Sequence, residues 1–240
     1  MDASDVIKEA IKPVRRPGAG ADVRAIVAGA VGRRGETLLN TVLSVGRYTE
    51  VTALVDENIA LGIKQLSTAT LDALPECQDL FLLISDASNP ETRSFHGRDA
   101  AFVLTDETNS KAIVDKAIER GVQRVALINP APIWLQFGEM SRATGDALER
   151  HLQELALQRL VIMRPMKQVT ASGGGITQRI INFYLSIQLM AMPRSMPVMT
   201  SDQIARLAIH LLNNGQGADI YNAQQLGEHH KKMRDLIASG

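Results

Sequence analysis

The sequence predicts an α/β protein built on a doubly wound parallel sheet. Three observations lead to this prediction. Short apolar runs alternate with stretches of helical spacing along most of the chain. The apolar runs are nearly continuous, as in parallel strands that are covered on both faces. The chain has 240 residues, of which 45% are hydrophobic, which is enough for one large domain with a full core. Right-handed crossovers between the strands then place helices on both faces of the sheet.

The elements are predicted in order from these runs. Strands are expected at 24–28, 50–55, 62–66, 79–85, 123–128 and 159–163, with a short seventh strand at 218–223. Helices are expected from a glycine-rich turn to about Val45, and at 106–120, 141–155, 176–192, 201–212 and 224–238. We expect three parts: an N-terminal extension over 1–22, a dinucleotide-binding core over 23–165, and a C-terminal lid or substrate region over 166–240 that packs on the core.

Composition excludes several classes of protein. The 26 basic residues balance the 26 acidic ones, so we expect no general attraction for nucleic acid or anionic membrane. No apolar run reaches the ~18–20 residues of a membrane span. The single cysteine, Cys77, cannot form an intrachain disulfide, and we interpret it as a buried structural thiol. The polar N-terminus does not resemble a secretory signal, so a cytoplasmic location is expected.

The strongest local pattern is G-x-x-G-x-x-G directly after the first strand. Gly29 allows a tight turn, Gly32 lets the backbone approach a pyrophosphate, and Gly35 lets the helix pack against the strand. Asp56 ends the second strand, 21 residues after Gly35, as the dinucleotide-binding fingerprint requires. This predicts a Rossmann fold with a dinucleotide at the first helix. The predicted cofactor-binding residues are Gly29, Val31, Gly32, Arg33, Arg34, Gly35, Asp56, Ser85, Asp86 and Ala87.

Two features of the same site point to different cofactors. Asp56 would accept hydrogen bonds from a ribose diol and repel a 2′-phosphate, which favours NAD. Arg33 and Arg34 would pair with a 2′-phosphate, which favours NADP, unless they merely face solvent. We expect NADP or NAD, with NADP preferred.

With the glycines placed, the chain resembles an atypical short-chain dehydrogenase/reductase. It is most similar to the branch of the Tat-interacting-protein-like oxidoreductases and the nitrogen-metabolite-repression regulators. The resemblance covers roughly residues 23–226. Four stretches carry it: Gly29 to Gly35, Lys111 to Ile128 (KAIVDKAIERGVQRVALI), Leu155 to Pro165 (LALQRLVIMRP) and Met196 to Leu212 (MPVMTSDQIARLAIHLL). The resemblance implies a Rossmann fold that binds NAD(P).

The chain departs from this family at the catalytic pair. Family members that catalyse reduction place Tyr-x-x-x-Lys on the helix before the sixth strand, where the tyrosine transfers the proton. Counting back from Arg164-Pro165 puts these positions at Ser141 and Gly145, or one residue earlier, and neither register supplies Tyr or Lys. Asn129 and Ser141 are the remaining, weak catalytic candidates, and no metal site is expected.

Three functions therefore stay open. The first is a nucleotide-responsive regulatory or binding protein that lacks the catalytic pair. The second is an NAD(P)-dependent oxidoreductase or an epimerase-like enzyme that uses other groups. The third is a scaffold subunit with an empty cleft, in which the helix at 176–192 forms a partner surface or a homo-oligomer contact.

Other polar or sulfur-containing groups carry a weaker signal. Acidic residues along the helix at 141–155 are expected on a solvated face, and His229 and His230 in a charged C-terminal tail. Methionines late in the chain are expected in ordinary core, with an adaptable pocket for a small apolar ligand as the alternative. The acidic residues are Asp146, Glu149 and Glu154, and the methionines are Met190, Met192, Met196 and Met199.

Overall fold

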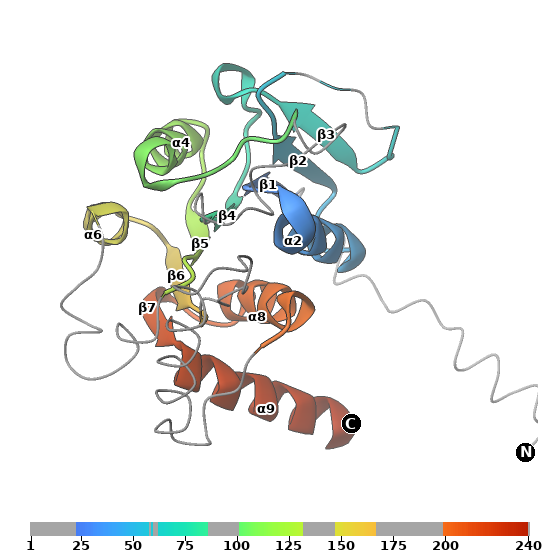
Figure 1. Ribbon diagram of the computed structural model, residues 1–240, viewed down its shortest axis with the longest axis vertical. Coiled ribbons are helices and arrows are strands. Elements are labelled where there is room, and N and C mark those ends of the chain that lie inside the picture. The colour runs from blue at the N-terminus through green and yellow to red at the C-terminus, as the bar shows by residue number, and fades with distance from the viewer. Residues whose placement is uncertain are drawn as a thin grey trace, which may run out of the picture.

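The computed structural model describes residues 23–57, 59, 62–85, 101–131, 147–166 and 199–239. Within these residues, seven strands form one sheet in which every neighbouring pair is parallel (Figure 1). The strands are β1 (Arg24–Ala28), β2 (Glu50–Leu54), β3 (Leu66–Ala69), β4 (Asp79–Leu83), β5 (Arg124–Ile128), β6 (Arg159–Arg164) and β7 (Gly217–Asn222). Their order, β3-β2-β1-β4-β5-β6-β7, contains the Rossmann order 3-2-1-4-5-6.

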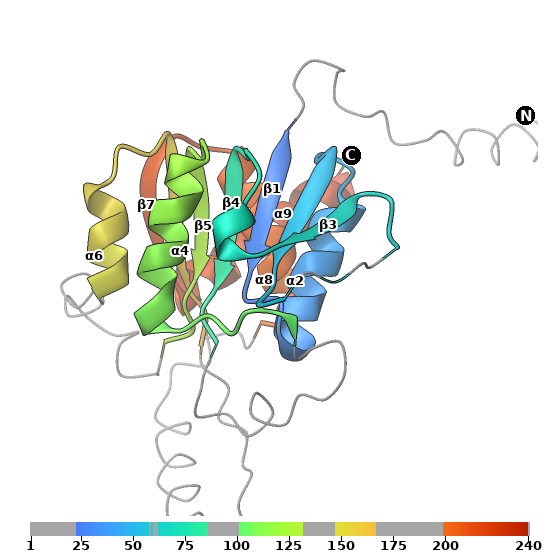
Figure 2. The ribbon, with the colours of Figure 1, turned by 90° about the horizontal axis from the view of Figure 1, so that it is seen from above.

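Helices cover both faces of this sheet, as Figures 1 and 2 show. The helices α2 (Gly32–Ser44), α8 (Ser201–Asn213) and α9 (Ala223–Ser239) lie on one face. The helices α4 (Glu107–Glu119) and α6 (Ala147–Glu154) lie on the other, together with the 3₁₀ turn Leu71–Ala73 between β3 and β4. The predicted doubly wound α/β fold is therefore confirmed.

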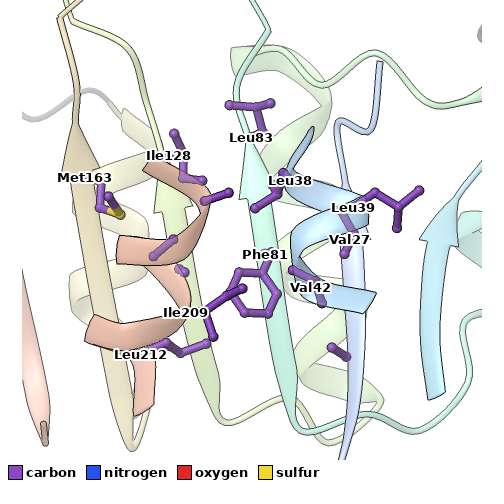
Figure 3. Close-up of a cluster of buried hydrophobic side chains, with 14 of the residues drawn as sticks. Val27, Leu38, Leu39, Val42, Phe81, Leu83, Ile128, Met163, Ile209 and Leu212 are labelled. Carbon is purple, nitrogen blue, oxygen red and sulfur yellow. The ribbon is translucent and has the colours of Figure 1, made fainter. Parts of the chain in front are cut away.

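Two separate cores result because side chains alternate along each strand. In β1, Ala25 and Val27 face α2 and α8, whereas Ile26 and Ala28 face α4 and α6. Phe81 of β4 lies at the centre of the first core, between α2 and α8 (Figure 3). Both faces of the strands are buried, which explains their continuous apolar sequence.

Most predicted strands and helices are confirmed within one or two residues. The third strand was predicted at 62–66 but lies at Leu66–Ala69, after Gly62 turns the chain with φ of +64°. Its residues Ser67 and Thr68 are polar, and Ser67 pairs with Thr52 through their hydroxyls at 3.0 Å. The prediction was wrong because an edge strand with this polar content gives no apolar run.

Several predictions fall outside the described residues: the extension 1–22, the helix at 176–192 and the first part of the helix at 141–155. The division into a core ending at 165 and a lid after it stays a prediction. Residues 217–222, at least, pair with β6 in the core sheet. Among the described helices, none has the length and apolar character needed to cross a membrane.

A buried polar cluster joins the connection between α2 and β2 to β4 and β5, at the amino ends of the strands. Asp79, fully buried, accepts a hydrogen bond from the Tyr48 hydroxyl at 2.8 Å and two from the Arg124 guanidinium at 2.6 and 2.5 Å. The Tyr48 ring packs edge-on against Phe81. Burial, followed by the negative charge of Asp79, raises the pKa of Tyr48. Cys77 is buried nearby, as expected, and burial raises the pKa of its thiol to about 11.

Replacing Tyr48 with phenylalanine tests this cluster. We expect Tyr48→Phe to lower the free energy of unfolding by about 1.5–3 kcal/mol near pH 8, the range for a hydrogen bond to a charged group. Because the Tyr48 pKa is higher in the folded chain, its stabilising contribution is complete below about pH 10 and is lost as the pH rises further. Urea unfolding at pH 8 and again above pH 10 should show that the free energy of unfolding falls less at the higher pH in the variant than in the unmodified protein. If the free energy of unfolding fell equally in both proteins above pH 10, the Tyr48 hydroxyl would not be the group responsible.

Candidate functional site: the carboxyl edge of the sheet

The turn between β1 and α2 is packed too closely to accept a side chain at Gly29 or Gly35. A Cβ atom on Gly29, which has φ of +83°, would lie 2.2 Å from the Leu83 carbonyl oxygen and 2.5 Å from Thr105 Oγ1. A Cβ atom on Gly35 would lie 2.4 Å from the Gly29 carbonyl oxygen. Gly32 has φ of +65°, in the left-handed region that favours glycine. The three glycines are therefore required by the backbone.

The start of α2 differs from the starts of α4 and α8. Its N-cap residue is Val31, which has no side-chain oxygen to accept from the first N–H groups, and its first turn holds no acidic residue. By contrast, α4 begins with a capping box of Asp106 and Asn109, and α8 with one of Thr200 and Gln203. The first turn of α2 therefore suits an anion from outside the helix.

Most other predicted cofactor residues also lie at the carboxyl edge, the lower edge of the sheet in Figure 2. Asp56 is exposed just beyond β2, and its N–H donates to the Ala101 carbonyl at 2.8 Å. Ser85 is half-buried just beyond β4, and its N–H donates to the Thr105 carbonyl at 2.9 Å. Asp86 and Ala87 lie outside the described residues.

The two neighbouring arginines of α2 point in different directions, since successive helical residues are about 100° apart. Arg33 is exposed. Arg34 is half-buried and faces a hollow between α2 and α8. That hollow lies on the far side of β1 from β2 and Asp56. The sequence pattern alone does not show that these two arginines point in different directions.

About 440 Å³ of space between protein atoms lies in the hollow, and this volume counts open solvent as well as enclosed space. It lies at the carboxyl ends of β4, β5 and β6, between the first turns of α2 and α8. Its described lining residues are Arg34, Leu38, Leu83, Ile128, Pro130, Pro165, Met166, Met199, Ser201, Ile204 and Ala205. Met199, which we expected in ordinary core, is buried and also lines this hollow. The other three late methionines fall in the undescribed stretch 167–198.

A buried ion pair joins α6 to the end of β6. Arg164 Nε donates to both carboxylate oxygens of Glu149 at 3.1 Å, and Arg164 Nη2 also contacts this carboxylate. The Asn129 amide donates to Glu149 Oε1 at 3.1 Å. The predicted solvated position of Glu149 was wrong, because Glu149 shares the buried face of α6 with Leu148 and Leu152.

The catalytic candidates and the tyrosines give no proton-transfer pair within the described part of the chain. Asn129 directs its amide to Glu149, and Ser141 lies outside that part. Tyr48 lies at the opposite, amino edge of the sheet. The hydroxyl of Tyr221 donates to Asp219 at 3.2 Å, and neither tyrosine lines the hollow. Tyr184 is not described.

No metal-binding cluster of three or more His, Cys, Asp or Glu side chains occurs among the described residues. His229 packs edge-on against the Tyr221 ring with centroids 5.0 Å apart, and burial lowers its pKa.

The ion pair gives a stability prediction. Glu149→Gln removes the carboxylate that pairs with the buried Arg164 guanidinium, so we expect a loss of about 3–5 kcal/mol in the free energy of unfolding. Glu154→Gln, on an exposed position of the same helix, should change it by no more than about 0.5 kcal/mol. Urea unfolding measures both. Equal effects of the two substitutions would show that the ion pair contributes nothing.

The comparisons with known proteins agree with the fold. A scan against protein-family models finds no match, and a search of curated proteins finds no relative. An oxidoreductase of the short chain dehydrogenase/reductase family from Burkholderia thailandensis is 16% identical, with a TM-score of 0.53 over 91% of this chain and 98% of that chain.

A second similar structure is UDP-N-acetylglucosamine 4-epimerase from Methanobrevibacter ruminantium M1 in complex with UDP-N-acetylmuramic acid. It is 11% identical, with a TM-score of 0.50 over 91% of this chain and 83% of that chain. At these identities the likeness is one of fold. Together with the strand order, it shows that the chain has a Rossmann-like α/β fold.

Proposed function

We propose that the chain binds a nicotinamide dinucleotide at the carboxyl edge of the sheet, with the pyrophosphate at the first turn of α2. The observation that carries this proposal is the glycine turn. Gly29 and Gly35 leave no room for a side chain, and the N–H groups that follow Val31 receive no cap from it. Oriented N–H groups and the positive end of a helix bind phosphate.

The position of the turn supports the same proposal. In open α/β sheets, ligands bind beyond the carboxyl ends of the strands, where the strand order reverses direction. In this sheet that point lies between β1 and β4, beside Gly29 and Leu83. A bound nicotinamide dinucleotide would supply a hydride donor or acceptor there. The chain's own residues would orient it and screen it from water.

The choice between NAD and NADP rests on fewer residues than the sequence suggested. Asp56 is exposed at the end of β2, where it can accept from a ribose diol. Arg34 faces the hollow on the other side of β1, so Arg33 is the arginine that remains as a candidate for a 2′-phosphate. We keep both cofactors in the proposal, and the preference for NADP now depends on Arg33.

The role of the bound dinucleotide is the second part of the proposal. We propose a binding or regulatory protein, because neither register of the Tyr-x-x-x-Lys pair is present in the sequence. The alternatives are an oxidoreductase or epimerase-like enzyme and a scaffold subunit with an empty cleft. Dinucleotide binding would distinguish the regulatory protein and the enzyme from the scaffold subunit. Turnover would distinguish the enzyme from the regulatory protein. The cytoplasmic location and a homo-oligomer stay predictions.

The binding prediction uses two glycines of equal φ. Gly32→Val places a side chain where the pyrophosphate approaches, so calorimetry should show loss of both NAD and NADP binding. Gly46→Val is the matched control, since Gly46 also has φ of +65° but has open space around its Cβ position at the far end of α2. The control should bind normally. Unchanged affinity in folded Gly32→Val protein would remove the proposed phosphate site.

Cofactor choice is tested at Arg33. If its guanidinium pairs with a 2′-phosphate, Arg33→Ala should weaken NADP binding by about 1.5–3 kcal/mol and leave NAD binding nearly unchanged. Arg234→Ala removes an exposed arginine from α9 and should affect neither cofactor. Equal weakening of NAD and NADP by Arg33→Ala would mean that Arg33 does not read the 2′-phosphate.

Turnover is tested with NADPH and NADH across aldehydes, ketones and quinones. General acid assistance typically contributes about 10²–10⁴-fold, and hydride transfer to a ketone leaves an alkoxide that needs a proton. We expect no measurable oxidation with non-quinone carbonyls, because the acid pair is missing. Steady turnover of any such carbonyl, abolished by Gly32→Val and kept by Gly46→Val, would favour the enzyme over the regulatory protein.

A further inference from the structure

A short segment, residues 101–105, crosses the carboxyl edge of the sheet just before α4, and we call it the strap. It runs in green along the lower edge of the sheet in Figure 2. The Ala101 carbonyl accepts from the Asp56 N–H beyond β2 at 2.8 Å. The Thr105 carbonyl accepts from the Ser85 N–H beyond β4 at 2.9 Å. Because β1 lies between β2 and β4, the strap spans about 10 Å, which an extended chain of this length covers.

The strap lies directly against the strand ends. The Val103 N–H donates to the Leu54 carbonyl at the end of β2 at 3.2 Å. Phe102 packs against the core under α2 and α8, and Val103 against the core under α4 and α6. Thr105 is fully buried, and its hydroxyl donates to the Leu83 carbonyl at the end of β4. The strap therefore takes up the space directly beyond β2 and β4.

The strap is held less firmly than the strands on which it lies. Residues 101–104 are half-buried, whereas the residues of β1 and β4 are almost all buried. Segments with few buried contacts open locally at a lower cost than global unfolding. At its far end the strap continues into the capping box of α4, where the Asn109 amide donates to the Leu104 carbonyl at 2.8 Å. An opening strap would therefore pivot at the start of α4.

The position of the strap overlaps the expected path of the dinucleotide. Ligands of open α/β sheets bind beyond the carboxyl ends of the strands. With the pyrophosphate at the first turn of α2 and the ribose at Asp56, the adenosine half would cross the ends of β1 and β2. The strap crosses the same ends. It also occupies the N–H groups of Asp56 and Ser85, two residues predicted to contact the cofactor.

We propose that the strap is an autoinhibitory gate of the dinucleotide site, and that the dinucleotide binds to molecules in which the strap has left the ends of β2 and β4. This inference rests on the proposed function and adds its regulation. When a ligand binds only an open fraction of the molecules, its apparent affinity is the intrinsic affinity reduced by that fraction. Loosening the strap should therefore strengthen dinucleotide binding.

Two substitutions loosen the strap in different ways. Thr105→Val removes the hydroxyl that bonds to the Leu83 carbonyl and keeps the shape of the side chain. Phe102→Ala removes an apolar anchor. Calorimetry with NAD and NADP should show apparent affinity raised about two- to tenfold by Thr105→Val, as expected when one neutral hydrogen bond no longer holds the closed state. Phe102→Ala should act in the same direction. Weaker binding in both folded variants would mean that the strap is a fixed wall of the site, and would overturn the gate.

The matched control makes the same chemical change away from the strap. Thr41 is buried near the far end of α2, and its hydroxyl donates to the Thr37 carbonyl at 2.7 Å. Thr41→Val should leave dinucleotide affinity unchanged, and circular dichroism should show that all three variants are folded. An equal gain in Thr41→Val and Thr105→Val would assign the gain to general loosening and contradict the gate.

Amide hydrogen exchange tests the gate on the unmodified protein. At saturating NAD or NADP, exchange of the Val103 N–H should become faster, because this group leaves the Leu54 carbonyl when the strap opens. Exchange at residues 32–36 should become slower in the same sample. Slowing at 32–36 with Val103 unchanged or slower would overturn the gate and leave the proposed function in place.

Failure of the proposed function gives a different result. If neither dinucleotide slows exchange at 32–36 in the unmodified protein or in Thr105→Val, the phosphate site and its gate are both wrong. Slowing in Thr105→Val alone would support the gate, since the closed strap would then prevent binding in the unmodified protein.

Discussion

The close packing of the glycine turn against β4 is the constraint on which the proposed site depends. The Leu83 carbonyl oxygen and Thr105 Oγ1 occupy the space in which a Cβ of Gly29 would lie. Thr105 also ties the segment before α4 to the end of β4, through Ser85 N–H at 2.9 Å. These contacts hold the end of β1 and the start of α2 beside the end of β4. The proposed phosphate would meet backbone N–H groups there, because Gly29, Gly32 and Gly35 carry no side chains.

Arginine side chains hold the strands around this turn at both edges of the sheet. Arg124 pairs with Asp79 at the amino edge, and Arg164 pairs with Glu149 at the carboxyl edge. Arg159 donates to the Leu211 carbonyl at 3.2 Å and to Asp219 at 2.6 Å, which joins β6 to the end of α8 and to β7. These pairs fix β4 to β7 and hence the proline-bearing ends that wall the hollow.

Sequence reasoning predicted most of the fold because parallel strands buried on both faces give continuous apolar runs, as in β1 and β4. It misplaced β3, since an edge strand with polar residues such as Thr68 gives no such run. It also missed the burial of Glu149. The available signal was the pair Leu148 and Leu152, which share its helical face, together with an arginine at the end of a buried strand.

The candidate site was predicted less completely than the fold. The glycines follow from backbone geometry alone, so their spacing identified the turn. The separate orientations of Arg33 and Arg34, by contrast, depend on how α2 is rotated against α8, which the sequence pattern does not specify. The hollow depends on the packing of α8 against β5 and β6, and α8 is distant from both strands in the sequence.

The most direct test of the central claim is amide hydrogen exchange on the full chain, with and without saturating NAD or NADP. If the pyrophosphate binds at the glycine turn, exchange should slow in the first turn of α2, residues 32–36. It should stay nearly unchanged in the first turn of α4, where Asp106 already accepts from the Thr108 and Asn109 N–H groups at 2.8 and 2.9 Å. Unchanged exchange at residues 32–36 with either dinucleotide would contradict the claim.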